Sequence, residues 1–481
     1  MNYSKIAAAL GGVLMAIGVS MVLPLIWSLY YGEHDWTTFL LCSVGTTFIG
    51  AIAYKSNNLE GSLNNKEALA VVSFSWIEAS VFGAIPYLLS GTFTSFADAL
   101  FETMSGFTTT GASVLTDVEV LTHGILFWRS LTHWLGGMGI IVLFVAILST
   151  LGVGGMQMFR AEAPGPVTEK LKPRISETAK ILWYTYLALT IAETLLLFVF
   201  GMPLFDALCH TFGTLATGGF STKNASIGFY GNPLIHWVII LFTFLAGANF
   251  ALHYQAFRGR SLKYFWRNAE FKLYTLIVLF SIALISIDLL SRVALPFETI
   301  LRQASFQVIS LITTTGYATA DFNEWSLFSK ALLVILMFIG GCSGSTSGAI
   351  KVGRILVLVK QSILELKQSL HPRAILSPKI DGKSITKEVL INIQEFFFIY
   401  IVIVGISVVI MAFLGLDLVS AFTAVAATLG NVGPGLAKVG PTQNYSFISD
   451  VGKYYLSFLM LLGRLELYTV LVLFLPSFWR K

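Results

Sequence analysis

The sequence has 481 residues, of which 55% are hydrophobic and 12% are charged, and its mean hydropathy is +0.76. Soluble domains carry about a quarter charged residues, so this composition excludes an ordinary soluble protein and indicates a multispanning membrane protein surrounded by lipid. The net charge of +5 does not indicate a nucleic-acid partner, because most lysines and arginines lie in short loops between apolar segments. Cys42, Cys209 and Cys342 form no CxxC pair and predict neither a disulfide framework nor a metal site.

Two apolar segments at the start of the chain, 6–30 and 37–54, are long enough to span a bilayer. The first lacks a clear small-residue cleavage site, so we expect it to be retained rather than removed as a signal peptide. Lys5 and the loop 55–66 place the flanks of this pair on the cytoplasmic side. Residues 1–65 are therefore predicted to form two extra N-terminal transmembrane helices.

From residue 66 onward one unit recurs four times: a span, a short re-entrant helix (96–107 in the first unit), a glycine turn and a second span. The predicted units are 66–174, 175–270, 271–384 and 385–481, and their spans are 68–89 and 125–151, 179–200 and 234–256, 274–295 and 327–359, 391–414 and 454–474. The third unit ends in a cytoplasmic linker. The expected fold is an all-α polytopic membrane protein with ten full spans and four half-spans, in which four repeats surround one pore.

Charge placement predicts the topology of these spans. Clusters of lysine and arginine follow the units at 160–174, 258–267, 360–387 and 480–481, whereas the opposite loops contain several acids. Positive residues are retained on the cytoplasmic side. Both termini are therefore predicted to be cytoplasmic.

The glycine turns are SGFTTTGAS (105–113), TLATGGFST (214–222), ITTTGYATAD (312–321) and TLGNVGPG (428–435). Non-helical backbone at membrane depth is tolerated only where protein buries it or where it lines a watery cavity. A ring of backbone carbonyls can replace the hydration shell of a cation, and glycine adopts the dihedral angles this requires at little cost. Glycines that serve only helix packing are the alternative, but packing does not explain the threonines. The predicted filter residues are Thr109, Thr110, Gly111, Ala216, Thr217, Gly218, Thr314, Thr315, Gly316, Asn431, Val432 and Gly433.

The second spans carry their own recurring signal, LGGMG (135–139), LAGA (245–248), IGGCSG (339–344) and LLGR (461–464). In the third unit this signal extends into GGCSGSTSG, which is too small and polar for a continuous lipid-exposed helix. We expect a broken helix whose middle forms a loop below the filter, with close glycine packing as the alternative. The predicted gate residues in this loop are Gly340, Gly341, Ser343, Gly344, Ser345, Thr346, Ser347 and Gly348.

Arg464 lies within the last span, where a charge is costly and usually faces protein or water. We expect it to face the pore axis as an electrostatic barrier. The alternative is a structural arginine paired with an acid of another helix, and Glu466 is excluded on the same helix face because residues two apart point away from each other. Arg129 and His133 are weaker candidates, and a lone histidine is more often a packing or hydrogen-bonding residue than a proton relay.

With these motifs, FTTTGAS (107–113), LATGGFST (215–222), TTTGYATAD (313–321) and GNVGPG (430–435), the whole chain resembles the Trk/Ktr/HKT superfamily of cation transporters, most closely its TrkH branch. The resemblance implies K⁺ as the transported ion, a bacterial cytoplasmic (inner) membrane, homodimerisation, a cytosolic nucleotide-binding TrkA-like subunit and an intramembrane gate loop. All four predicted filter positions are glycine, and the resemblance implies that glycine rather than serine at the first of them, Gly111, favours potassium over sodium. The fourth turn departs from the TTTG pattern, so the pore is not expected to be four-fold symmetric.

Three other functions were weighed. A sodium or sodium/potassium-coupled transporter of the same superfamily stays open. An organic-solute secondary transporter would usually show inverted repeats and fewer broken helices. An enzyme would need clustered catalytic side chains, and the chain has no catalytic triad, P-loop or Rossmann motif, so we expect no enzyme activity and no organic cofactor in this chain. Membrane lipid is an expected partner and nucleic acid is not.

Overall fold

The computed structural model describes residues 1–57, 63–137, 175–371 and 377–480. These residues are almost entirely helical, with one short antiparallel pair of strands, β1 (Lys379–Ile380) and β2 (Lys383–Ser384). The all-α prediction is confirmed. The only strands of the described part of the chain lie between α17 and α18, in the region predicted as a cytoplasmic linker.

The N-terminal pair forms as expected. Helices α1 (Tyr3–Ser20) and α2 (Val22–Tyr31) together make one apolar span, and α3 (Trp36–Lys55) makes the second and packs along α1. Gly11 and Gly50 face each other between α1 and α3, and an added Cβ on Gly11 would lie 2.7 Å from the carbonyl oxygen of Gly50. Small residues let helix backbones approach closely inside a membrane. Helix α1 also contacts α4, which joins the pair to the first repeat.

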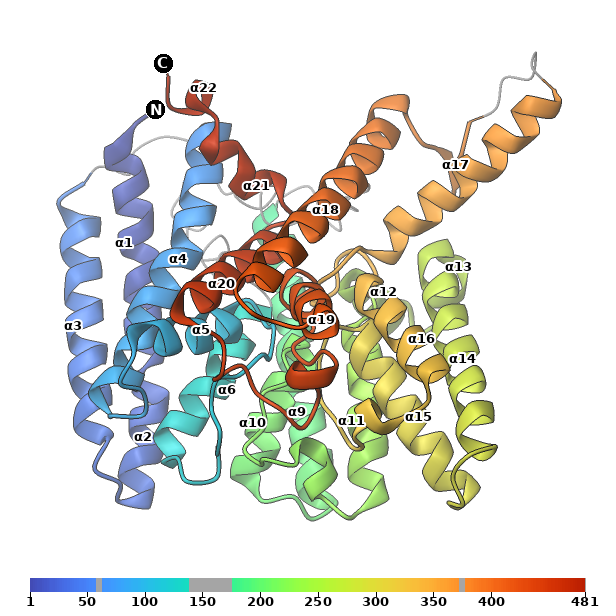
Figure 1. The fold of residues 1–481 in the computed structure, drawn as a ribbon. Coiled ribbons are helices and arrows are strands. Elements are labelled where there is room, and N and C mark those ends of the chain that lie inside the picture. Colours follow the sequence, from blue (N-terminus) through green and yellow to red (C-terminus); the bar gives the residue numbers. More distant parts are fainter. Residues whose placement is uncertain (58–62, 138–174, 372–376, 481) are drawn as a thin grey trace.

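Four successive sets of helices follow (Figure 1). Each set begins with a long helix and continues with a short, largely buried one. The long helices are α4 (Asn65–Leu89), α9 (Ile175–Val199), α14 (Ala269–Leu290) and α18 (Lys387–Phe413), and the short ones are α5 (Phe96–Phe107), α10 (Leu204–Ala216), α15 (Phe297–Ile312) and α19 (Leu418–Leu429). The short helices are the predicted re-entrant half-spans. Each stops at the filter motif of its repeat.

The second helices of the second and fourth repeats are interrupted. α11 (Pro233–Ala246) and α12 (Phe250–Gly259) meet at 99°, and α20 (Asp450–Arg464) meets α21 (Tyr468–Leu471) and η5 (Val472–Phe474) at 114°. Continuous spans at 234–256 and 454–474 were therefore a wrong prediction. The helices end where the glycine motif packs against a neighbouring pore helix: a Cβ on Gly247 would lie 2.6 Å from Thr313 Cγ2.

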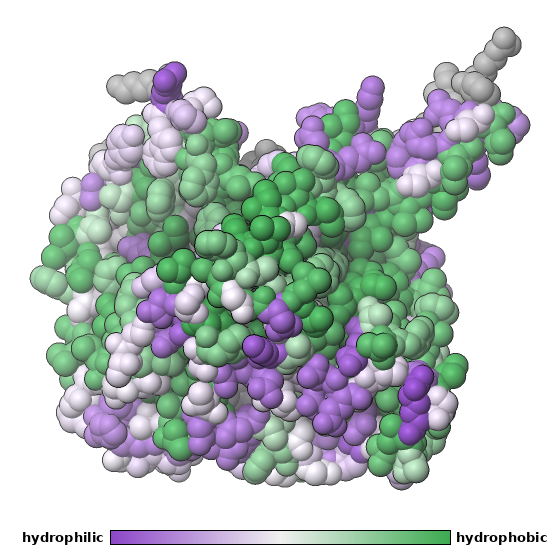
Figure 2. Space-filling view, in the orientation of Figure 1, coloured by the Kyte–Doolittle hydropathy of each residue, from purple (hydrophilic) through white to green (hydrophobic). Residues whose placement is uncertain are grey.

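The third second span is broken as predicted, because α16 (Leu327–Phe338) and α17 (Val352–Leu370) are separated by residues 339–351. In the first repeat α6 (His123–Gly137) is described, whereas the rest of the expected span 125–151 lies outside the described residues. Among the described residues six helices are long and apolar enough to cross a membrane, or eight if each bent pair counts as one. Hydrophobic residues cover much of the middle of the molecule in Figure 2, with hydrophilic residues along the lower edge and on segments projecting at the top.

Both ends of the chain lie at the same end of the molecule (Figure 1). Lys66 Nζ, at the start of α4, donates to the carbonyl oxygens of Ser477 and Arg480 at 3.2 Å each. Helix α17 projects from this same end, away from the body of the protein.

Candidate functional site

The segments that follow the four pore helices share one backbone geometry. The first residue of each segment and its glycine two positions later both have positive φ, the left-handed region that glycine tolerates best. The middle residue donates its N–H to the carbonyl five residues earlier in the pore helix, at 2.7–2.9 Å in every repeat. We call these the filter segments: 109–111, 217–219, 314–316 and 431–433. Their first-residue φ values are 55° at Thr109, 54° at Thr217, 58° at Thr314 and 52° at Asn431.

The second filter segment differs from the prediction by one residue. Ala216 is the last residue of α10, and Gly218 takes the middle place that Thr110 holds in the first repeat. The glycine with positive φ is Gly219, at 86°. Assigning Ala216 and Gly218 as the outer members of this segment was therefore wrong. TLATGGFST contains two successive glycines, and only the left-handed turn at Thr217 decides which one matches Gly111.

The four filter segments close into a ring. A Cβ added to Gly111 would overlap the carbonyl oxygen of Gly218, and one on Gly219 would overlap that of Thr315. The same contact joins Gly316 to Val432 and Gly433 to Thr110, which returns to the first repeat. Each glycine thus lies against the middle carbonyl of the next repeat, and no larger residue fits there without moving that carbonyl. The arrangement is a four-membered ring built within one chain.

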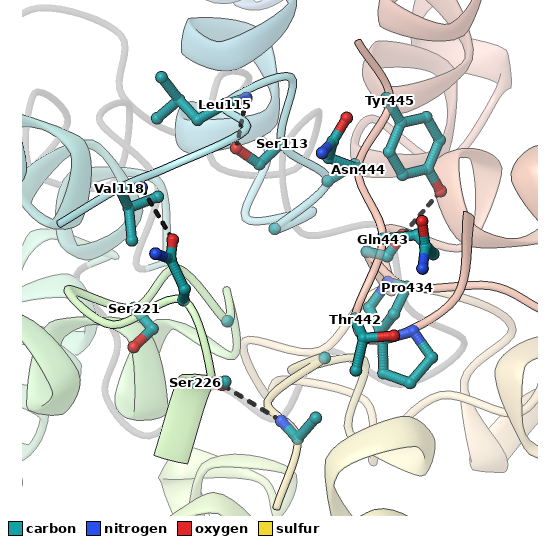
Figure 3. Close-up of a pocket in the computed structure, with 18 of the residues that line it drawn as sticks. Ser113, Leu115, Val118, Ser221, Ser226, Pro434, Thr442, Gln443, Asn444 and Tyr445 are labelled. Atoms are coloured by element: carbon teal, nitrogen blue, oxygen red, sulfur yellow. Dashed lines mark hydrogen bonds between the residues drawn. The ribbon is translucent and has the colours of Figure 1, made fainter. Parts of the chain in front are cut away.

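A polar cavity opens on one side of this ring (Figure 3). All four glycines of the ring line it, and most of the other lining residues come from the loops that follow the filter segments, such as Ser113, Ser221 and Tyr445, while Arg129 lines it from α6. The Tyr445 hydroxyl donates to the Gly433 carbonyl at 2.8 Å, which ties the cavity wall to the ring. The cavity therefore leads directly to the filter segments.

The loops that follow the filter segments carry acids and amides near this cavity. Asn224 accepts a hydrogen bond from Val118 N at 2.9 Å and donates from its amide to Asp117 at 2.7 Å, which links loops of the first two repeats. The hydrogen bond from the Asn224 side chain and one from the Glu119 N–H lower the pKa of the Asp117 carboxyl below its usual value. Asp117 therefore stays ionised near the cavity at neutral pH.

The threonine side chains brace the backbone. The Thr108 and Thr110 hydroxyls are 2.8 Å apart, and those of Thr313 and Thr315 are also 2.8 Å apart. In the fourth repeat the Asn431 side chain braces the backbone instead. Its amide donates to Thr110 Oγ1 at 3.0 Å and to the Met460 carbonyl at 2.9 Å. The departure from TTTG seen in the sequence thus replaces a hydroxyl pair by a link between the fourth and first repeats.

The 339–351 loop lies directly against the filter segments. Gly348 N donates to Thr314 Oγ1 at 2.6 Å, Ala349 N to the Gly430 carbonyl at 2.9 Å, and Thr346 Oγ1 to the Leu215 carbonyl at 3.0 Å. Thr346 and Ser347 are buried. The loop therefore touches the second, third and fourth repeats where their pore helices pass into the filter segments. The predicted break is present, and its role as a gate stays a prediction.

One anchor of this loop was not predicted. Glu270, in the first turn of α14, accepts hydrogen bonds at 2.7 Å from the backbone N–H groups of Ser343 and Gly353. Its carboxylate thus joins the start of the loop to the start of α17. In the sequence Glu270 is one acid at the start of a long apolar span, which indicates only a helix cap.

Arg464 lies beside the loop and the ring. Its Nη1 donates to Thr109 Oγ1 at 3.0 Å and to the Thr346 carbonyl at 2.9 Å, and its Nη2 donates to the Gly136 and Gly137 carbonyls at 2.6 and 3.0 Å. The guanidinium therefore connects the fourth repeat to the first and to the loop. Glu466, excluded as its partner from the sequence, forms an ion pair with Arg354 instead.

The two weaker candidates hold the first two repeats together. His133 Nδ1 lies 2.7 Å from the Gly106 carbonyl, and its Nε2 accepts the N–H of Phe220 at 3.1 Å. The hydrogen-bonding interpretation of His133 therefore matches its contacts. Arg129 makes a buried ion pair with Glu102, in which Arg129 Nε lies 2.6 Å from Glu102 Oε1.

Among the described residues no group of three or more His, Cys, Asp or Glu side chains could hold a metal ion.

Comparison with known proteins decides the family. The profile of the TrkH family, described as cation transport proteins, matches residues 39–481. The chain belongs to the TrkH family. A Trk system potassium uptake protein TrkH of Salmonella typhimurium is 42% identical, with 100% of both chains covered, and TrkI of Halomonas elongata is 32% identical over 100% of this chain and 98% of its own. The crystal structure of the potassium transporter TrkH from Vibrio parahaemolyticus matches with a TM-score of 0.90, at 38% identity and full coverage of both chains.

Membership of the TrkH family confirms the resemblance to the Trk/Ktr/HKT superfamily and the polytopic membrane fold. It also confirms that the chain is a cation transport protein rather than an enzyme.

Proposed function

We propose that this chain is the ion-conducting subunit of a potassium uptake system, and that K⁺ crosses the membrane through the ring of filter segments. The closed ring carries the proposal. Four carbonyls, one from each repeat, sit against four glycines, and such a ring can replace the water around a cation without any charged ligand. The potassium uptake named for the relatives supports K⁺ over Na⁺ as the cargo.

Flux into proteoliposomes tests this function. Purified protein should carry K⁺ and Rb⁺ faster than Na⁺ or Li⁺, because a ring spaced for larger ions coordinates the smaller ones poorly. Protein-free vesicles supply the background. Equal Na⁺ and K⁺ flux, or K⁺ flux that requires a Na⁺ gradient, would contradict the proposal and favour the sodium-coupled alternative.

We also propose that the 339–351 loop gates the pore. The hydrogen bonds of Gly348 and Thr346 to the inner end of the filter support this role, because a loop in that position obstructs the exit from the ring. Glu270 and the loop's own backbone bonds would hold it closed. Opening then requires the loop to leave these partners.

Deletion of residues 343–347 should raise basal K⁺ flux severalfold. The ends of the loop are already joined, since Gly340 N donates to the Ile350 carbonyl at 2.9 Å and Ile350 N to the Phe338 carbonyl at 3.2 Å. A shorter connection can therefore keep α16 and α17 in place. Flux is measured per folded protein, with Ser369→Ala on exposed α17 as the control. A folded deletion variant with wild-type flux would indicate that the loop only packs.

The inner membrane is proposed as the location, with both termini cytoplasmic. This orientation is supported by the basic residues Arg258, Arg260, Lys263 and Lys360, because positive residues are retained on the cytoplasmic side.

A cytosolic nucleotide-binding subunit is proposed as a partner, since this chain carries no nucleotide motif of its own. Nucleotides added to the chain alone should leave its flux unchanged, and a direct effect would contradict this division of roles.

A homodimer is proposed through α17. Val359, Ile363, Leu366 and Leu370 recur at helical spacing, and each has an exposed fraction of 47–77% in the isolated chain. An apolar stripe of this kind is typical of an association surface. Ile363→Glu combined with Leu366→Glu should shift the purified protein from dimer to monomer in light scattering. Gln368→Glu, on the opposite face of α17, is the control, and a dimer that survives the double change would place the interface elsewhere.

A further inference from the structure

One position behind the filter carries a different polar residue in three of the four repeats. Counting eight residues back from each middle carbonyl of the ring gives Glu102, His210, Gln307 and Ala424. All four lie in the pore helices and are buried. The repeats therefore differ at a position where a side chain can reach the loop that follows the filter.

In the first repeat, Glu102 forms hydrogen bonds with Ser113 and Val114, two residues of the loop that follows the ring. Its Oε2 accepts the Val114 N–H at 2.9 Å, and its two oxygens lie 2.9 and 3.1 Å from the Ser113 hydroxyl. In the second repeat the matching residue, His210, bonds the matching serine: Nε2 lies 2.9 Å from Ser221 Oγ. His210 Nδ1 lies 2.7 Å from the Asp206 carbonyl and must donate to it. In the neutral imidazole Nε2 therefore carries no proton and accepts the hydrogen bond of the Ser221 hydroxyl.

Arg129 of α6 joins these two contacts. Its Nε donates to Glu102 at 2.6 Å, its Nη1 donates to the Ser221 carbonyl at 2.9 Å, and its guanidinium lies 3.7 Å from the centre of the Phe220 ring. Hydrogen bonds between ionised groups are about twice as strong as neutral ones, and the guanidinium presents its donors in a fixed fork. Arg129 therefore fixes the distance between Glu102 of the first repeat and the chain that leaves the second filter segment at Ser221.

This link has no counterpart on the other side of the ring. In the fourth repeat the matching residue is Ala424, whose side chain cannot form a hydrogen bond. Gln307 of the third repeat makes one long neutral contact, from Nε2 to Thr319 Oγ1 at 3.5 Å, and its Oε1 has no hydrogen-bond partner among the described residues. At this position behind the filter, the charge-assisted link therefore joins only the first and second repeats among the described residues.

Resting on the proposed filter, we propose that Glu102 and Arg129 are positioning residues for selectivity: their ion pair sets the spacing of the first two filter segments and thereby the preference for K⁺ over Na⁺. Carbonyl ligands discriminate between ions by their number and spacing. A filter segment that is free to move toward the pore axis can therefore bring its carbonyl close enough to coordinate the smaller Na⁺. Neither residue belongs to the filter segments, and Arg129 lines the cavity beside them. Both side chains act through Ser113, Val114 and Ser221.

Arg129→Lys is the decisive variant. Lysine keeps the positive charge but cannot reach Glu102 and the Ser221 carbonyl together. We expect the K⁺/Na⁺ flux ratio to fall by about fivefold or more, with K⁺ flux largely retained. Arg302→Lys is the matched control, because Arg302 pairs with Glu298 on the same pore helix and bonds His236, not a filter strand. Its flux ratio should equal that of the wild type.

Ser113→Ala provides a second variant that removes one hydroxyl and leaves both charges in place. It should lower the flux ratio in the same direction by a smaller factor, which keeps the test open if Arg129→Lys does not fold. A purely structural role predicts a lower melting temperature and less flux with an unchanged ratio. That result in folded Arg129→Lys, or in Ser113→Ala if the first variant does not fold, overturns the inference.

Gly316→Ser, measured in the same assay, separates this inference from the proposed filter. If Gly316→Ser loses selectivity and the folded Arg129→Lys and Ser113→Ala variants do not, the ring stands as the filter and the positioning role is wrong. If Gly316→Ser leaves the ratio unchanged, the ring is not the filter, and the positioning proposal fails with it.

Discussion

Replacing Arg464 with alanine should raise K⁺ flux per folded protein by about tenfold. At an effective dielectric constant of about 20, two unit charges roughly 6 Å apart repel by about 3 kcal/mol, which corresponds to about a hundredfold in rate. Water in the pore screens part of this repulsion, hence the lower figure. The change also releases the Thr346 carbonyl of the loop, which acts in the same direction.

Arg464→Lys separates charge from tethering. Lysine retains the positive charge but cannot bond Thr109, Thr346 and the Gly136 carbonyl together. If charge is the barrier, the lysine variant keeps low flux; if tethering closes the pore, it conducts like the alanine variant. Arg292→Ala, which removes a largely exposed arginine paired with Asp288, should leave flux unchanged.

The opposite outcome for Arg464→Ala is equally specific. All four of its described hydrogen bonds end on carbonyl or hydroxyl oxygens, so alanine would leave buried acceptors without a donor. A variant that melts early and conducts more slowly would show that Arg464 is mainly structural. Flux and melting temperature measured on the same preparation decide between the two roles.

The elements with strong local signals were predictable. The first re-entrant helix was expected at 96–107, and α5 spans Phe96–Phe107, because an apolar stretch too short to cross a membrane ends at a glycine turn. The break after Phe338 was also expected, since a long run of glycine and serine cannot continue a helix in lipid.

The errors arose where backbone contacts between repeats decide the structure. The predicted second filter segment was displaced by one residue because the sequence does not distinguish Gly218 from Gly219. The left-handed turn at Thr217 and the neighbouring carbonyl of Thr315 together identify Gly219. With Thr217 taken as the middle residue, the position eight residues earlier is Cys209 rather than His210. The sequence alone therefore did not show that His210 matches Glu102. With the correct register, the eight-residue spacing from His210 to Gly218 would have been visible in the sequence.

The bends after Ala246 and Arg464 have the same origin. Their motifs, LAGA and LLGR, contain one glycine each, which a helix tolerates at about 1 kcal/mol relative to alanine. What ends these helices is tertiary contact in both cases: Gly247 packs against Thr313 of the third repeat, and an added Cβ on Gly463 would overlap the Leu429 carbonyl of the fourth repeat's own pore helix. Local sequence carries no signal for such a contact.

Serine at Gly316 should reduce the K⁺/Na⁺ flux ratio by about tenfold or more. Gly316 has φ of 81°, where a side chain is strained, and its Cβ would overlap the Val432 carbonyl and lie 2.7 Å from Pro434 Cδ. Val432 belongs to the fourth repeat. The serine side chain at position 316 of the third repeat therefore displaces a ring carbonyl of a different repeat. Selectivity should fall even though the substituted residue keeps its own carbonyl.

Gly91→Ser is the matched control for this prediction. Gly91 has a similar φ of 75° but nothing within 4 Å of an added Cβ, so the change imposes backbone strain of about 1–2 kcal/mol without moving a carbonyl. Both variants should lose some thermal stability, and only Gly316→Ser should lose selectivity. If both keep the wild-type flux ratio, the ring does not select the ion. If both lose it equally, the loss reflects general destabilisation, and the displaced Val432 carbonyl is not its cause.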